Sequence, residues 1–279
     1  MVSNSVSIQQ YGLQLIVVVM LAVAGHAFVS VPTRVVYSSS LEQRGRHGRQ
    51  ANRFQPLAAG SVTDEISSEV QALFDNVEQK MIQSNGKVSV DVLEPILAKI
   101  EATNTYDEPN RSQTYKGQWY TWYTNCPPPS NGQLGPFQGS SEQEIPLTGN
   151  SYDNILRLPP NSENSWLTVT LEGKWEDWNG ILLDDDNNDD GSSSSGNNTN
   201  EEDWGAKYWK VTFLRLNFSL FGNKVFSQEF PPNVARVWRT TYLNDTTGTR
   251  IVRAGQTGRI DDEYVFYMKR TPRPTTSSS

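Results

Sequence analysis

The sequence holds very little of the chemistry on which most enzymes depend. Its 279 residues include one cysteine, Cys126, and two histidines, His26 and His47. One cysteine excludes an internal disulfide, and Ser-His-Asp triads, Cys–His pairs and most zinc sites need histidine or several cysteines. The glycine-rich loops of nucleotide-binding proteins and the G-x-S-x-G nucleophile motif are also absent. The sequence therefore predicts no metal site and no cofactor, and it favours a binding protein over an enzyme.

The remaining polar motifs are weak candidates for a site. Glu142 and Glu144 lie two positions apart on one face of a predicted strand, but such a pair is more typical of a solvated outer face than of an acid–base pair. Residues 184–203 are rich in Asp, Ser and Asn, and 186–191 match the first half of a calcium-binding EF-hand loop. The twelfth loop position is Asn197 instead of a bidentate Glu, so we interpret this stretch as a disordered acidic insertion.

The first residues are predicted to be a signal peptide, over 1–27. Leu13 to Ala24 is a nearly unbroken apolar run, which is too short for the roughly 20 residues of a membrane-spanning helix. No Lys or Arg precedes this run, which is atypical for a signal peptide. We expect no transmembrane span in the remainder of the chain.

Residues 28–60 have the composition of a transit peptide, with five arginines, several serines and one acid, Glu42. The Ala27-Phe28 junction resembles the cleavage site of the bipartite presequences used by algae with complex, diatom-like plastids. This resemblance predicts import into a plastid through the secretory route, and a secreted protein with a disordered basic start is the alternative. Removing five arginines and one acid would lower the net charge from −7 to about −11. Bulk electrostatics then argues against nucleic acid as a partner.

Two helices are expected within a helical lead-in over residues 61–104, because apolar residues recur there with helical spacing. We expect this helical pair to pack on the part of the chain that follows. The apolar positions are Val70, Leu73, Phe74, Val77 and Met81 in the first helix, and Val92, Leu93, Ile96, Leu97 and Ile100 in the second.

From residue 115 onward the apolar period changes to two, which is typical of β-strands. Many short strands separated by turns indicate a sandwich or a barrel, and about eight strands close a barrel that is wide enough for one small ligand. We therefore predict a mainly β fold, an antiparallel barrel over 115–270 with a short N-terminal helical segment and a disordered tail over 271–279. The predicted strands are Gln118–Thr124, Phe137–Leu147, Tyr152–Leu158, Trp166–Glu176, Lys207–Phe218, Asn233–Leu243, Thr249–Ala254 and Glu263–Arg270.

Two sets of motifs resemble known families. Gly117-Gln118-Trp119 is similar to the Gly-x-Trp that opens the first strand of lipocalins. The resemblance implies a lipocalin-like barrel in which Trp119 closes the floor and packs against a late basic residue, here Arg270, with Gly117 in a structural role. The segments that resemble the plastid lipid-associated proteins, or fibrillins, are Tyr123-Thr124, 129–137, 240–244, 250–253 and 264–266.

The fibrillin resemblance implies binding of a lipid or prenylquinone at thylakoid membranes or plastoglobules, with peripheral association at their surface. Large aromatic side chains suit an apolar ligand cavity, although each of them is also a normal core residue. The resemblance gives Arg250 and Arg253 a role at the barrel end or at a polar ligand head, and salt bridges on a strand face are the alternative. The candidate ligand-binding residues are Trp119, Tyr123, Phe137, Trp209, Phe213, Trp238, Tyr242, Arg250 and Arg253.

The sequence thus predicts a plastid lipid-associated protein that binds or sequesters an apolar ligand. Two alternatives stay open at this point. One is an enzyme, or a subunit associated with an enzyme, of plastid isoprenoid or quinone metabolism that works without histidine. The other is a secreted lipocalin-like carrier.

Overall fold

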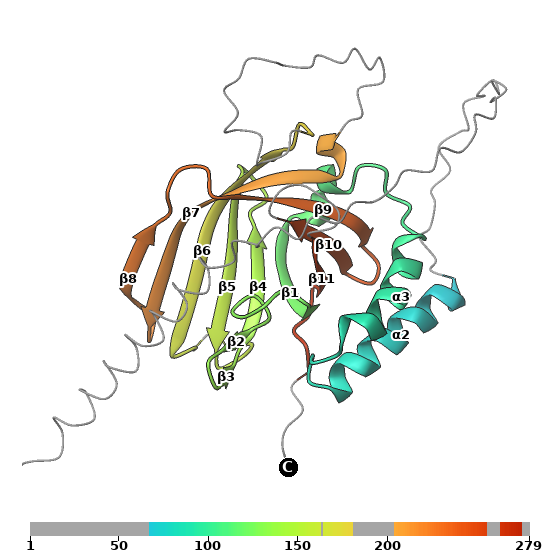
Figure 1. Ribbon diagram of the computed structural model, residues 1–279, viewed down its shortest axis with the longest axis horizontal. Helices are drawn as coiled ribbons and strands as arrows, with labels where there is room; N and C mark the ends of the chain where they lie inside the picture. The colour runs from blue at the N-terminus through green and yellow to red at the C-terminus, as the bar shows by residue number, and fades with distance from the viewer. Residues whose placement is uncertain (1–66, 163, 181–203, 256–262, 275–279) are drawn as a thin grey trace, which may run out of the picture. The chain divides into compact units, whose positions relative to one another are not determined.

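In the part of the chain that the computed structural model describes, two helices precede a long series of antiparallel strands (Figure 1). The structure describes residues 67–162, 164–180, 204–255 and 263–274. All of these belong to one compact unit of the chain. The predicted signal peptide, transit segment, acidic insertion and half EF-hand loop lie outside the described residues.

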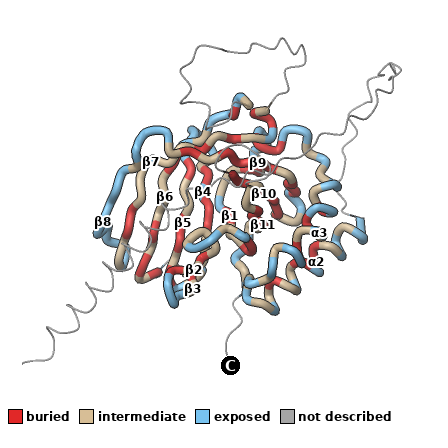
Figure 2. The backbone as a smooth tube through the Cα atoms, viewed as in Figure 1, coloured by how far each residue is buried: buried red, intermediate tan, exposed pale blue. Residues whose placement is uncertain are grey.

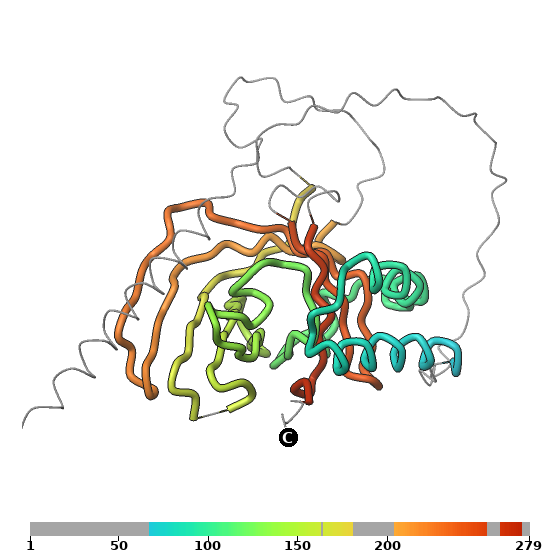
Figure 3. Tube along the Cα trace, turned by 60° about the horizontal axis from the view of Figure 1, so that its bottom comes forward, coloured from blue at the N-terminus to red at the C-terminus, as the bar shows by residue number. Residues whose placement is uncertain are grey.

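Both predicted helices are present, as α2 (Ser68–Gln83) and α3 (Val90–Glu101). The side chain of Ser67 caps α2 by accepting a hydrogen bond from the Val70 backbone amide at 3.3 Å. Each helix buries one apolar face, and the two helices lie beside β9–β11 in both Figure 1 and Figure 3.

Eight strands close into a ring, in the order β1-β4-β5-β6-β7-β9-β10-β11 and back to β1. Every pair is antiparallel, so the prediction of a mainly β barrel of about eight strands behind a helical segment is confirmed. The strands are β1 Gly117–Thr124, β2 Gln133–Leu134, β3 Phe137–Gln138, β4 Ser140–Ile145, β5 Ser151–Leu158, β6 Leu167–Asp177, β7 Tyr208–Leu220, β8 Asn223–Glu229, β9 Ala235–Asn244, β10 Thr249–Gly255 and β11 Tyr264–Lys269. Short 3-10 turns are η1 Pro109–Arg111, η2 Gln113–Tyr115 and η4 Trp204–Ala206.

A ninth strand, β8, lies outside the ring. The first part of β7 pairs with β9, whereas its second part, from Arg215 to Leu220, pairs with β8. All seven residues of β8 are exposed, as Figure 2 shows. This strand was not predicted from the sequence, because a strand without a buried face carries no apolar alternation.

The strand predicted over Phe137–Leu147 is two elements, which is a correction to the sequence analysis. Residues 137–138 form a hairpin with β2, and β4 begins at Ser140. Gly139 separates them, and a Cβ atom at this position would lie 2.3 Å from the carbonyl oxygen of Arg157. Glycine at this position therefore permits a close approach of two backbones.

Strand alternation gives the barrel two separate cores. The outer core lies between the helices and the outward face of the strands next to them, and the inner core fills the barrel. The outer core contains Phe74, Val77, Met81, Leu93, Leu97, Ile100, Trp122, Tyr123, Tyr242, Ile251, Val265 and Tyr267. The inner core contains Tyr115, Trp119, Ile145, Tyr152, Trp209, Val211, Trp238, Leu243, Val252, Ala254, Phe266 and Met268.

Candidate functional site

The candidate site is the interior of the barrel, where aromatic rings from several strands meet. Trp175 of β6 stacks on Trp209 of β7 with ring centroids 4.0 Å apart and an interplanar angle of 11°. Trp238 of β9 stacks on Phe266 at 5.1 Å and meets Tyr152 edge-on at 5.5 Å. Trp175 and Trp209 belong to the adjacent strands β6 and β7, whereas the contacts of Trp238 join strands that are not neighbours in the sheet. The rings therefore meet across the barrel interior.

Arg250 of β10 lies among these rings and is fully buried. Its guanidinium carbon lies 4.7 Å from the ring centroid of Tyr115 and 4.5 Å from that of Trp119. Its one hydrogen bond runs from Nη2 to the sulfur of Met268, a weak acceptor, at 3.3 Å. Nε and Nη1 have no hydrogen-bond partner, and no described Asp or Glu forms an ion pair with this residue.

Burial lowers the pKa of Arg250 from its ordinary value, because the charged form loses its hydration. An arginine side chain nevertheless stays protonated inside proteins. The barrel interior therefore holds a positive charge that the described carboxylates do not compensate.

A second cation stands at the edge of this aromatic cluster. The Nζ atom of Lys116 lies 3.7 Å from the ring centroid of Trp175 and 4.4 Å from that of Trp209, and it has no hydrogen-bond partner. Burial lowers the pKa of Lys116 to about 8, and the nearby carboxylate of Asp177 partly opposes this shift. Lys116 is thus largely protonated at neutral pH.

Polar side chains of β4 and β5 face the same interior. The Tyr152 hydroxyl donates to Oδ1 of Asn154 at 3.0 Å, and Nε2 of Gln143 donates to the same oxygen at 3.2 Å and to the Tyr152 hydroxyl. Burial raises the pKa of Tyr152 well above its ordinary value, so this hydroxyl stays protonated. The amide oxygen of Gln143 and the indole nitrogens of Trp175 and Trp238 have no partner.

The structure brings together the three residues of the Gly-x-Trp resemblance, namely Gly117, Trp119 and Arg270. The guanidinium carbon of Arg270 lies 3.7 Å from the ring centroid of Trp119, and Nη1 donates to the Gln118 carbonyl at 3.0 Å. Gly117 has a φ of +94°, and a Cβ atom there would lie 2.9 Å from Nη1 of Arg270. Only glycine combines that backbone conformation with so close an approach.

The structure separates the predicted ligand-binding residues into two groups. The inner core contains Trp119, Trp209 and Trp238, with Arg250 among them and Phe213 packed at its edge. The remaining four lie elsewhere. Tyr123 and Tyr242 belong to the outer core against the helices, Arg253 pairs with α3, and Phe137 is 38% exposed on the β2–β3 hairpin.

Arg253 forms ion pairs with Glu101 at 2.8 Å and with Glu94 at 2.6 Å, so it ties β10 to helix α3. Burial alone would lower the pKa of Arg253, but the hydrogen bonds that it donates to the two carboxylates outweigh this effect and raise its pKa. Of the two roles considered in the sequence analysis, this geometry matches the salt bridge.

Glu142 is a correction to the sequence analysis, because the interpretation as a solvated face is wrong for this residue. Its side chain is 2% exposed and pairs with Arg157 at 3.0 Å. Gln118 and Ser140 also donate to it, at 3.0 Å and 2.8 Å. A carboxylate that accepts from this many donors is a structural group of the strand face.

Several interior residues were not predicted from the sequence, namely Lys116, Gln143, Tyr152, Asn154 and Trp175. Tyr152 and Trp175 carried a signal, since both stand in predicted strands with alternating pattern. Gln143 and Asn154 carried no such signal in the sequence, because polar residues in a half-buried strand are normally assigned to the solvent face.

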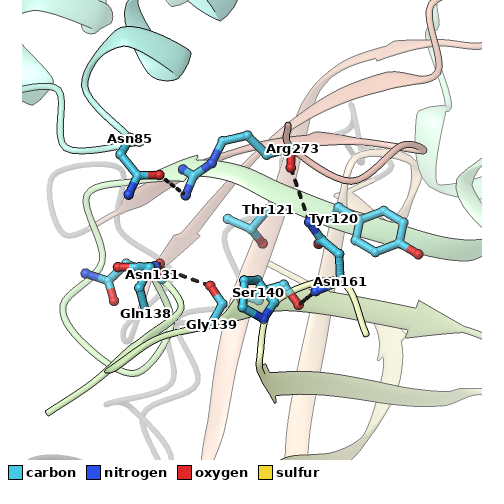
Figure 4. A pocket seen from close by; sticks show the side chains of 11 residues that line it. Asn85, Tyr120, Thr121, Asn131, Gln138, Gly139, Ser140, Asn161 and Arg273 are labelled. Carbon is cyan, nitrogen blue, oxygen red and sulfur yellow. Dashed lines mark hydrogen bonds between the residues drawn. The ribbon is translucent and has the colours of Figure 1, made fainter. Parts of the chain in front are cut away.

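A separate pocket of about 190 Å³ lies beside the barrel interior, where β1 and β4 part beyond their paired residues (Figure 4). Arg273 closes one side of it, donating to the Trp122 carbonyl at 3.0 Å and to Oδ1 of Asn85 at 3.4 Å. Asn161 donates to the Arg273 carbonyl at 3.2 Å. These bonds join the C-terminal segment to β1, to the turn between α2 and α3, and to the loop after β5. We therefore interpret the residues that line this pocket as structural.

The rest of the described chain shows no other obvious centre. Across 67–162, 164–180, 204–255 and 263–274, no three His, Cys, Asp or Glu side chains are grouped so that they could hold a metal ion. None of the helices in these ranges is long and apolar enough to cross a membrane.

No protein-family model matches this chain, and a search of curated proteins gave no match.

Proposed function

We propose that the barrel interior binds an apolar ligand such as a lipid or prenylquinone, and that the protein acts as a fibrillin-like, plastid lipid-associated protein at thylakoid membranes or plastoglobules. The observation that carries this proposal is the aromatic interior with polar atoms that have no partner. Buried polar groups in proteins are nearly always hydrogen-bonded, so such a cluster in a barrel is typical of a binding site.

Binding is better supported than catalysis. The chain has no histidine after His47. The raised pKa of Tyr152 leaves its hydroxyl protonated at neutral pH, where it cannot serve as a general base. The proposal therefore assigns the interior residues to holding a ligand.

The test of ligand binding is organic extraction of the protein purified from its native source, followed by mass spectrometry. A co-purifying apolar compound is expected. Titration of the recombinant protein with a short-chain prenylquinone should also quench its tryptophan fluorescence. If nothing apolar is extracted, and neither quinone nor fatty acid quenches the fluorescence, the binding proposal fails.

A pair of matched variants locates the quenching. Trp238→Phe removes an indole of the inner core, whereas Trp166→Phe removes one that is half-buried beside Phe137 on the hairpin. We expect the quenched amplitude to fall in the first variant and to stay unchanged in the second. Equal quenching in both would place the quinone outside the barrel.

The proposed plastid location has its own test. A fluorescent protein fused behind residues 1–60 should accumulate in plastids of a diatom-like alga. Secretion of the fusion, or a glycan at Asn197 of the native protein, would instead support the secreted carrier. Asn244 is a poor site for a glycan, because the residue is 9% exposed and its side chain accepts a hydrogen bond from the Thr247 backbone amide at 2.9 Å.

A further inference from the structure

We infer that the ligand of the barrel carries a carboxylate group, and that Arg250 binds it. This inference rests on the proposed function, since it names the polar head of the ligand held in the same interior.

The first argument is the buried charge of Arg250. Buried charged groups in proteins are normally paired with an opposite charge, because an unpaired charge loses its hydration without compensation. Arg250 is fully buried, and its one hydrogen bond goes to a thioether sulfur. A ligand carboxylate would supply the missing counter-charge.

The second argument is the orientation of the guanidinium. The ring centroids of Tyr115 and Trp119 lie 4.7 Å and 4.5 Å from the central carbon of the guanidinium. Cation–π contacts use the charge of the group, whereas its N–H bonds lie in the guanidinium plane and need acceptors. Nε and Nη1 are without acceptors in this structure. The rings thus hold a guanidinium whose remaining donors suit a planar, two-oxygen acceptor.

The third argument is the kind of polar atoms that lack partners. Besides Arg250 they include the Nε1 atoms of Trp175 and Trp238 and the ammonium of Lys116, all of which are donors. Gln143 contributes one acceptor atom, Oε1. Because donors outnumber acceptors and two of the side chains are cations, the head group must be an acceptor with negative charge.

A carboxylate fits this environment better than a neutral quinone. The carbonyl oxygens of a quinone could accept hydrogen bonds, but they would leave the charge of Arg250 uncompensated. The aromatic inner core suits the apolar remainder of such a molecule. The predicted ligand class is therefore an acid with an apolar chain or ring system.

The experiment compares laurate with methyl laurate, which share a chain and differ in charge. Binding to the full, delipidated chain is measured by tryptophan fluorescence and calorimetry. We expect wild-type protein to bind laurate at least about tenfold tighter than the ester, as charge-assisted hydrogen bonds allow. Equal affinity for acid and ester in the wild type would overturn the inference without any variant.

Variants then assign the preference to Arg250. Arg250→Met should reduce laurate affinity to that of the ester and leave ester affinity unchanged, and Arg250→Lys should keep part of the preference. Arg273→Met is the control, because Arg273 is half-buried and forms no ion pair with a described carboxylate, but lies at the separate pocket. A preference that persists in Arg250→Met would refute the assignment. If neither laurate, its ester nor a prenylquinone binds wild-type protein, the proposed function itself fails.

Discussion

Arg250→Met should make the ligand-free protein more stable, which is unusual for a change in a barrel core. The substitution removes a buried guanidinium and replaces it with an unbranched side chain that adapts to irregular spaces. The same change at Arg253, three positions along the strand, should have the opposite effect. The two variants form a matched pair because both arginines belong to β10 and differ in their partners.

The magnitude at Arg250 follows from its contacts. The substitution removes two cation–π contacts of Arg250, each worth about 1 kcal/mol, and its weak hydrogen bond to the sulfur of Met268. It also removes the desolvation cost of an uncompensated buried ion, which is several kcal/mol. We expect a net gain of about 2 kcal/mol in the free energy of unfolding.

The magnitude at Arg253 follows from its two carboxylate partners. Its side chain is 14% exposed, and Glu101 is 15% exposed, so the pair is largely removed from water. Breaking such a pair leaves a buried carboxylate without its cation, at a cost of about 3 kcal/mol. Glu101 would retain only the hydrogen bond from the Thr241 hydroxyl, 2.6 Å long.

The assay is urea unfolding of delipidated protein, followed by circular dichroism and tryptophan fluorescence. With a slope of about 2 kcal/mol per molar urea, the midpoint should rise by about 1 M for Arg250→Met and fall by about 1.5 M for Arg253→Met. Added laurate should stabilise the wild type more than it stabilises Arg250→Met, because the variant keeps only the affinity expected for the ester. If Arg250→Met lowers the midpoint as far as Arg253→Met does, Arg250 is a structural residue and the reasoning is refuted.

Three further outcomes are expected. Arg270→Ala should lower the free energy of unfolding by about 2 kcal/mol in urea titrations, because it removes the cation over Trp119 and the donor to several backbone carbonyls. An unchanged midpoint would contradict the interpretation that Arg270 holds the barrel floor together. Gly117→Ala should cost about 1–2 kcal/mol, since its φ is +94°, and equal stability in thermal unfolding would contradict this. Burial and two nearby glutamates raise the pKa of Asp153 from 3.8 to about 6, so its ionisation in the folded state reduces stability as pH rises through that window. Asp153→Asn should therefore stabilise the protein by about 1 kcal/mol at pH 7.5 and have no effect near pH 3.5; the reverse dependence would show that the carboxylate is favourably placed.

Local pattern predicted most of the fold. The alternation within Trp209, Val211 and Phe213 indicated a strand with one buried face, and these residues do point into the inner core. The helical spacing of Phe74, Val77 and Met81 likewise matches the buried face of α2. Such periodicity exists because burial itself imposes it, so β8, which is exposed throughout, could not be predicted from it.

The candidate site was only partly predictable. Composition showed that aromatic residues were available, but Tyr123 and Trp119 differ in destination although both stand in β1. A bulge between Thr121 and Tyr123 shifts the register of β1 against β11, and the sequence carries no mark of it. Gln143 and Asn154 face inward against the usual preference of polar residues.

Arg250 and Arg253 show the division between sequence and tertiary structure most directly. Their spacing of three in a strand determines that they take opposite faces, and the Gly-x-Trp motif determines where the barrel begins. Neither feature says which face is the interior. Which arginine receives a counter-charge depends on where α3 packs, because the helix brings Glu94 and Glu101 to the outward arginine, while the inward one has no described carboxylate paired with it. The sequence alone determined most of the strands and their alternation, and only the tertiary structure decided which arginine received a counter-charge, because the carboxylate partners of Arg253 lie 152 and 159 positions away in the sequence.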